Sequence, residues 1–220
     1  VASRYRRFPL LSSWSSLLNS VGLELPALFL AAFYGTQITG WFALGQRVVA
    51  APMTLVGRSV SQVYIGEASR LLREDPGGLR GLFVSTVRRL SFLGSGPIIA
   101  LGIVAPWVFG WVFGSDWTEA GRYVQALAPM FLLQFIVSPL SGTVDVLERQ
   151  DLHLLNEVLR IAFLSGGVGI AVVFNLGGFA AVLALSIMGT ISYTTYGLIC
   201  WYAVVAEGRQ IDQETKGGSV

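Results

Sequence analysis

Two arginines lie inside one of the most apolar stretches of the sequence, where a charged side chain is costly. Arg47 and Arg58 both fall within a predicted helix over residues 40–65. An arginine at membrane depth costs about 2.5–3.5 kcal/mol on insertion scales, so such residues usually face protein or water and mark functional positions. Eleven residues are about three helical turns, so the two side chains share one face. The planar guanidinium group matches phosphate oxygens, which indicates a site for an anion.

Polar neighbours extend this cationic face. Thr54 lies near it, and Gln62 follows Arg58 by four residues, which is one turn of a helix. A helix with such a stripe is suited to lining a hydrated path. Gln46 lies beside Arg47. A glutamine within a membrane span more often forms a hydrogen bond to another helix than a contact with a ligand.

Two structural interpretations of these arginines stay open. Arg58 can lie near a membrane surface and extend its charge to the lipid headgroups. Arg47 can pair with Glu24 of the preceding apolar segment, so that both charges are neutralised. Glu24 is then a counter-ion, and otherwise it is a candidate proton-relay carboxylate.

The overall composition places the chain among membrane proteins. Of its 220 residues, 53% are hydrophobic and 13% are charged, and its mean hydropathy is +0.63. Soluble domains carry about 25% charged residues. We therefore predict an all-α, polytopic membrane protein.

Six segments are long and apolar enough to cross a bilayer, for which about 20 residues are needed. In chain order they cover approximately residues 14–34, 40–65, 90–113, 123–144, 154–174 and 178–205. Glycine-rich or charged stretches separate them. We expect them to form one six-helix bundle over residues 1–220.

The basic residues indicate the orientation of this bundle. Twelve of them lie in, or flank, the loops and ends predicted for one side: Arg4, Arg6, Arg7, Arg70, Arg73, Arg80, Arg88, Arg89, Arg149, Arg160, Arg209 and Lys216. The opposite loops contain only Arg122. Because positive loops stay in the cytoplasm, both ends of the chain are predicted to be cytoplasmic. The basic segment 66–89 is predicted to lie along the anionic leaflet.

Prolines are concentrated in the first four segments: Pro26, Pro52, Pro97, Pro106, Pro129 and Pro139. Proline removes a backbone hydrogen bond and bends a helix. Bent helices suit a transporter that opens to one side at a time, and they are also used for ordinary packing.

Several kinds of chemistry have no support in the sequence. It contains no P-loop motif for ATP hydrolysis. His153, the only histidine, is predicted to be a solvated loop residue, so we expect no metal site and no cofactor. Asp116 and Glu119 are predicted to form a solvated turn in an outer loop. Cys200, the only cysteine, is predicted to be a packed core thiol.

Three stretches of the sequence resemble a known family. The opening RYRRFPLLSSWSSLLNSVGLELPALFLAAFYG resembles the linker and seventh span of Wzx-type polysaccharide flippases, which belong to the MOP superfamily with MATE drug exporters and lipid II flippases. GWFALGQRVVAAPMTLVGRSVSQVYIGEASRL is similar to their eighth span, with Gln-Arg near its start and a proline in the middle. VDVLERQDLHLLNEVLR is similar to the connection between the tenth and eleventh spans.

The resemblance implies the C-terminal six-helix half of a twelve-helix transporter. The chain does not begin with Met, and we expect it to be a piece of a longer protein that lacks the N-terminal half. Such proteins flip an undecaprenyl-pyrophosphate-linked oligosaccharide across the bacterial inner membrane for O-antigen and lipopolysaccharide synthesis. The resemblance assigns Arg47 and Arg58 to the diphosphate, Gln46 and Gln62 to sugar or phosphate, and Glu24 to ion coupling.

The expected partners are the lipid-linked oligosaccharide, membrane lipids, and glycan polymerase and assembly proteins, with no nucleic acid. Alternative functions are a MATE-like, cation-coupled exporter of small molecules, a membrane-embedded glycan polymerase or glycosyltransferase, and a scaffold without transport activity. A cation exporter favours acidic residues in its cavity, and a glycosyltransferase needs catalytic carboxylates at an outer loop. We therefore expect a transporter and not an enzyme.

Overall fold

The computed structural model describes the backbone of residues 7–75 and 77–217, and the side chains of residues 22–75 and 77–208. Within these ranges the chain is helical and contains no strand. The helices are α1 (Arg7–Glu74), α2 (Gly78–Phe113), α3 (Thr118–Val137), α4 (Gly142–Val146), α5 (Gln150–Val173) and α6 (Gly178–Gly217), with 3-10 turns η1 (Ser115–Trp117) and η2 (Ser138–Ser141). The all-α architecture predicted from the sequence is confirmed.

Five helices in the described part of the chain are long and apolar enough to cross a membrane. One of them, α1, contains two helical limbs, because Gly35 has non-helical dihedral angles of φ 85° and ψ 172°. Glycine adopts a positive φ without the steric penalty that a Cβ atom brings. The break falls at the first residue of the predicted loop between the first two spans, and it lies at neither of the interior prolines of α1, Pro26 and Pro52.

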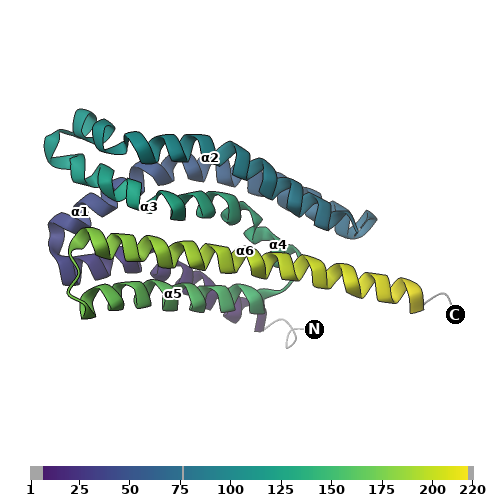
Figure 1. The fold of residues 1–220 in the computed structure, drawn as a ribbon. Helices are drawn as coiled ribbons and strands as arrows, with labels where there is room; N and C mark the ends of the chain where they lie inside the picture. The colour runs from purple at the N-terminus through teal and green to yellow at the C-terminus, as the bar shows by residue number, and fades with distance from the viewer. Residues whose placement is uncertain (1–6, 76, 218–220) are drawn as a thin grey trace.

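The helical limbs run back and forth along one axis (Figure 1). α1 begins and α6 ends at the same end of the bundle, which also contains the turn between α1 and α2 and the connection between α4 and α5. α3 lies at the centre and packs against α1, α2 and α6, while α5 packs against α1 and α6. Leu127 of α3 is completely buried. The core therefore surrounds α3.

The helices α1 and α2 extend beyond their predicted spans. Residues 66–74 continue α1, and residues 78–89 begin α2, so the basic segment forms two helix ends and not a separate helix along the leaflet. Arg70 binds Glu67 and Glu74 of the same helix. Arg80 lies over the ring of Trp201 at 5.2 Å from its centre. The pairs of Arg70 lie within one helix and favour its continuation, whereas the contact of Arg80 joins the start of α2 to α6.

α2 and α3 pack closely because a glycine lies at their contact. A Cβ atom on Gly121 would lie 2.5 Å from the carbonyl oxygen of Ala105. Small residues let two helix backbones approach in this way. Glycine at this position therefore lets α3 lie directly against α2.

α3 ends where proline interrupts its hydrogen-bond pattern. Pro139 lacks a backbone N–H and begins the change to the 3-10 turn η2. The Ser141 hydroxyl donates to the Ser138 carbonyl at 2.8 Å. Next to this turn, a Cβ atom on Gly142 would clash with the side chain of Ile65. The turn is thus held directly against α1, and its serines border the cavity described next.

Candidate functional site

A cavity of about 310 Å³ lies between the second limb of α1 and the end of α3. Its polar lining comes from two directions: Thr54, Arg58 and Ser61 on α1, and Gln134, Ser138 and Ser141 on α3 and η2. On α1 these residues repeat at spacings of three and four, so one face of the helix borders the cavity. We call this cavity the Arg58 lobe.

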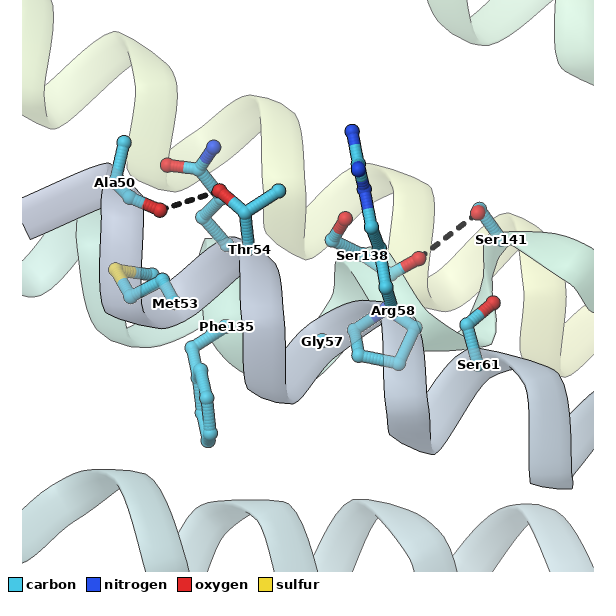
Figure 2. Close-up of a pocket in the computed structure, with 11 residues that line it drawn as sticks. Ala50, Met53, Thr54, Gly57, Arg58, Ser61, Phe135, Ser138 and Ser141 are labelled. Atoms are coloured by element: carbon cyan, nitrogen blue, oxygen red, sulfur yellow. Dashed lines mark hydrogen bonds between the residues drawn. The ribbon is translucent and has the colours of Figure 1, made fainter. Parts of the chain in front are cut away.

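Arg58 supplies a positive charge to this lobe. Figure 2 shows its side chain on the same side of α1 as the Thr54 hydroxyl, while Phe135 points to the opposite side. Thr54 itself donates to the carbonyl of Ala50. Within the described residues Arg58 is exposed and forms no ion pair. Its charge is therefore available to an anion that enters the lobe.

A second cavity of about 460 Å³ continues the first. The two cavities share Ala50 and four polar residues, Thr54, Gln134, Ser138 and Ser141, so they form one chamber with two parts. α5 contributes His153, Asn156, Glu157 and Arg160 to the second part, and α6 contributes Ser192, Tyr193 and Tyr196. We call this part the α5 lobe.

The α5 lobe contains a buried ion pair. Arg160 Nη2 lies 2.6 Å from Glu157 Oε2, and the two side chains are only 11% and 3% exposed. The guanidinium group lies against Gly22 of α1, where a Cβ atom would be 2.6 Å from Arg160 Nη2. Burying charges is costly unless each has its counter-ion. Glycine in α1 thus leaves the room that this arginine needs beside its carboxylate.

His153 closes one side of the α5 lobe. Its Nδ1 is 3.1 Å from the hydroxyl of Tyr196, which is buried. The prediction that His153 is a solvated loop residue is wrong, because α5 begins at Gln150 and carries His153 into the bundle. Within the described residues, no three His, Cys, Asp or Glu side chains are grouped so that they could hold a metal ion.

The residues predicted as substrate contacts do not all lie in this chamber. Arg58 lines it, whereas Arg47 is exposed one turn before Ala50 and lines neither lobe. Gln62 lines a separate groove of about 940 Å³ between α1 and α2. Gln46 is half-buried and also outside both lobes.

Glu24 lies near the chamber but does not line it. Its neighbour Leu23 contributes to the α5 lobe, whereas Glu24 itself is exposed. No ion pair joins Arg47 to Glu24 in the part of the chain whose side chains are described, so the alternative of a neutralised pair is not observed. Asn19, another polar residue of the first segment, has a side chain outside the described residues.

Sequence reasoning missed the most buried charges of the site. The count of basic residues places Arg160 with the predicted cytoplasmic charges, and Glu157, within the segment 154–174, has no predicted role. Their spacing of three residues, inside an apolar segment, was the available signal, because it places both side chains on one helical face. In the structure, Arg160 lines the chamber and does not lie at the predicted membrane surface.

The outer turn shows no catalytic arrangement of carboxylates. Glu119 pairs with Arg122 at 2.6 Å, and both side chains are more than a third exposed. The backbone carbonyl of Asp116 accepts a hydrogen bond from Trp41 at 3.0 Å, and the residue is exposed. These contacts agree with the predicted solvated turn. Cys200 is a free, buried thiol, as predicted.

Comparison with known proteins assigns the chain to a family. Residues 1–122, which are more than half of the chain, match the model of a family described as polysaccharide biosynthesis protein. Neither the characterised proteins nor the solved structures compared with the chain gave a match. The matched part includes both limbs of α1, and with them Arg58. The chain therefore belongs to the polysaccharide biosynthesis protein family.

Proposed function

We propose that this protein is a transporter that turns an undecaprenyl-pyrophosphate-linked oligosaccharide from the cytoplasmic to the outer leaflet of the bacterial inner membrane. The carried glycan would then enter a surface polysaccharide such as O-antigen. The observation that carries the proposal is Arg58, a cation without an ion-pair partner among the described residues, beside a polar chamber in an apolar bundle. Family membership supports a role in polysaccharide biosynthesis.

The physical problem of such a transporter is the diphosphate. A charged headgroup cannot cross the hydrocarbon core without a large desolvation cost. A fixed guanidinium group offers charge-assisted hydrogen bonds, which are stronger than neutral ones, and the serine and threonine hydroxyls around it can replace part of the lost water. The Arg58 lobe supplies both kinds of group.

The other predicted contacts have secondary roles in this proposal. Arg47 and Arg58 are separated by about 16 Å along the helix at 1.5 Å per residue, so Arg47 would meet the headgroup on its way to or from the chamber. Gln46 lies beside Arg47. Gln62 would contact the substrate from the groove between α1 and α2. Glu24 remains a proposed coupling carboxylate beside the α5 lobe.

The arrangement of helix ends supports the predicted orientation. Figure 1 shows the α1–α2 turn and the α4–α5 connection at the end of the bundle where α1 begins and α6 ends. Arg73, Arg80 and Arg149 lie at these connections. Placing that end in the cytoplasm follows the positive-inside rule. In this proposal the helices form one bundle of a two-bundle transporter.

The test is complementation of a flippase-null bacterial strain, with surface polysaccharide measured on gels and protein levels measured by immunoblot. We expect Arg58→Ala and Arg47→Ala to abolish export while the protein level stays normal, because each removes a phosphate-binding cation. Arg122→Ala is the matched control, since Arg122 lies at the outer turn and already pairs with Glu119. Normal export in both of the first two variants would refute the proposal.

A further inference from the structure

We propose that the α5 lobe binds the sugar that is joined directly to the diphosphate, while the Arg58 lobe binds the diphosphate itself. The inference rests on the proposed function and adds a second subsite to it. It depends on three features of the α5 lobe: two polar side chains that form no hydrogen bond among the described residues, a balanced charge, and direct continuity with the Arg58 lobe.

The first feature is a pair of polar side chains, Asn156 and Ser192, that form no hydrogen bond among the described residues. Asn156 and Ser192 line the α5 lobe and are only 4% and 3% exposed. Among the described residues neither side chain forms a hydrogen bond, although neighbouring Thr190, Thr194 and Thr195 all donate to backbone carbonyls. Their polar atoms are not fully enclosed by protein and open onto the lobe that they line. A ligand or water in the lobe can therefore complete their hydrogen bonds.

The second feature is the balance of charge. Arg160 and Glu157 are paired at 2.6 Å, so the α5 lobe has no net charge from this pair, in contrast to the Arg58 lobe. Because the opposite charges lie side by side, their fields largely cancel, and the pair offers neither a cation nor an anion a net attraction. A neutral ligand with many hydroxyl groups needs no such attraction. It can also donate to and accept from an amide or a hydroxyl, since both groups have both capacities.

The third feature is the continuity of the chamber. Thr54, Gln134 and Ser138 line both lobes, so a ligand can occupy the two at once. The α5 lobe measures about 460 Å³, within the range of about 300–1,000 Å³ typical of small-molecule sites. A diphosphate beside Arg58 would place the directly attached sugar at Asn156 and Ser192. The two lobes thus match the anionic and neutral parts of one molecule.

The test measures equilibrium binding to the native protein in lipid nanodiscs by titration calorimetry. The probes are undecaprenyl diphosphate and undecaprenyl diphosphate carrying one N-acetylhexosamine. For the unaltered protein we expect the sugar to increase affinity about tenfold, as one or two new hydrogen bonds would. Asn156→Leu combined with Ser192→Ala should reduce this ratio to about one, and the affinity for the bare diphosphate should change by less than about twofold.

Two further variants keep the test interpretable if the double variant does not fold, or if removing any buried serine hydroxyl changes binding. Ser192→Ala alone removes one hydroxyl from the lobe and should reduce the ratio by about threefold, even if Asn156→Leu does not fold. Ser186→Ala is the matched control, because Ser186 is equally buried on α6 and lies outside both lobes. It should leave the ratio unchanged.

The outcomes separate this inference from the proposed function. Equal binding of the two lipids by the unaltered protein would overturn the sugar subsite, as would an unchanged ratio in the double variant. A sodium-dependent rise in melting temperature that Ser192→Ala removes would overturn it in favour of a cation site. If Arg58→Gln weakens binding of neither lipid, the proposed diphosphate site fails, and the ratio between the lipids still reports on the sugar.

Discussion

Arg58 and Arg160 border one chamber, but they differ in burial and in whether an acidic side chain pairs with them. Arg160 is buried, pairs with Glu157 at 2.6 Å and lies against a glycine that makes room for it. Arg58 is exposed and has no ion pair among the described residues. A charge buried in the protein needs its partner for stability. A charge that faces a polar cavity without a partner contributes little to stability and is available for binding.

Some residues of the chamber thus stabilise its walls, and others are available to bind a ligand within it. In this account Glu157, Arg160 and Gly22 form the structural side, and Arg58 forms the binding side. Changes on the structural side should lower the stability of the folded protein. Changes on the binding side should affect transport at nearly constant stability.

The largest effect on stability is expected from Glu157→Leu. This change removes the carboxylate that neutralises a buried guanidinium group, and breaking such a pair costs about 3–5 kcal/mol. Thermal unfolding in detergent should show a clear loss of melting temperature. The double variant Glu157→Leu with Arg160→Met should recover much of this loss, because no unpaired charge remains. A single variant as stable as the unaltered protein would remove the structural role of the pair.

A smaller loss is expected from Gly22→Val. The new side chain begins where the Arg160 guanidinium lies, with the Cβ atom 2.6 Å from Nη2, and the guanidinium must move away from Glu157. Overpacking of this kind costs about 1–3 kcal/mol. The effect should shrink in an Arg160→Met background, because the two changes act on the same contact. Equal losses in both backgrounds would show that Gly22 matters for another reason.

Arg58→Met should change stability by less than about 0.5 kcal/mol, since it removes an exposed side chain without an ion pair in the described structure. Surface polysaccharide should nevertheless disappear in the complementation assay. If Arg58→Met destabilised the protein as much as Glu157→Leu, the assignment of Arg58 to binding and not to stability would be contradicted, because lost export would then report unfolding.

The smallest effect is expected at the exposed pair of Arg70 and Glu67, whose side chains are 49% and 39% exposed. The hydrogen bond from Arg70 lowers the pKa of the Glu67 carboxyl below its usual range. A lowered pKa in the folded protein stabilises it above the pKa of the unfolded chain, and this stabilisation is lost as pH falls through the folded value. Glu67→Gln should remove that small acid dependence, and high salt should weaken it. An unchanged acid dependence in Glu67→Gln would assign it to other carboxyl groups.

The sequence was most informative where apolar segments and rare charges coincide. The helical class and the break at Gly35 follow from length and hydropathy, and the cost of a charge at membrane depth singles out Arg58, which lines the chamber. These are local properties of the chain, and the family resemblance added the expected substrate.

The α5 lobe could not be predicted in the same way. Its members come from both limbs of α1, from α3 and η2, and from α5 and α6, and only tertiary packing brings Leu23, Asn156 and Ser192 together. A count of basic residues near span ends places Arg160 at the surface, because it does not show which of these residues face inward. Gln62 shares a helix with Arg58 but faces the groove beside α2, because the direction of a stripe depends on the neighbouring helices.

The central claim is that Arg58 binds the diphosphate, and the affinity of the native protein for undecaprenyl diphosphate tests it most directly. Hydrogen bonds to a charged group contribute about 1.5–3 kcal/mol, so Arg58→Gln should weaken binding by about 10- to 100-fold. Arg122→Gln should bind as the unaltered protein does. An Arg58→Gln variant that is folded and binds undecaprenyl diphosphate with unchanged affinity would contradict the account.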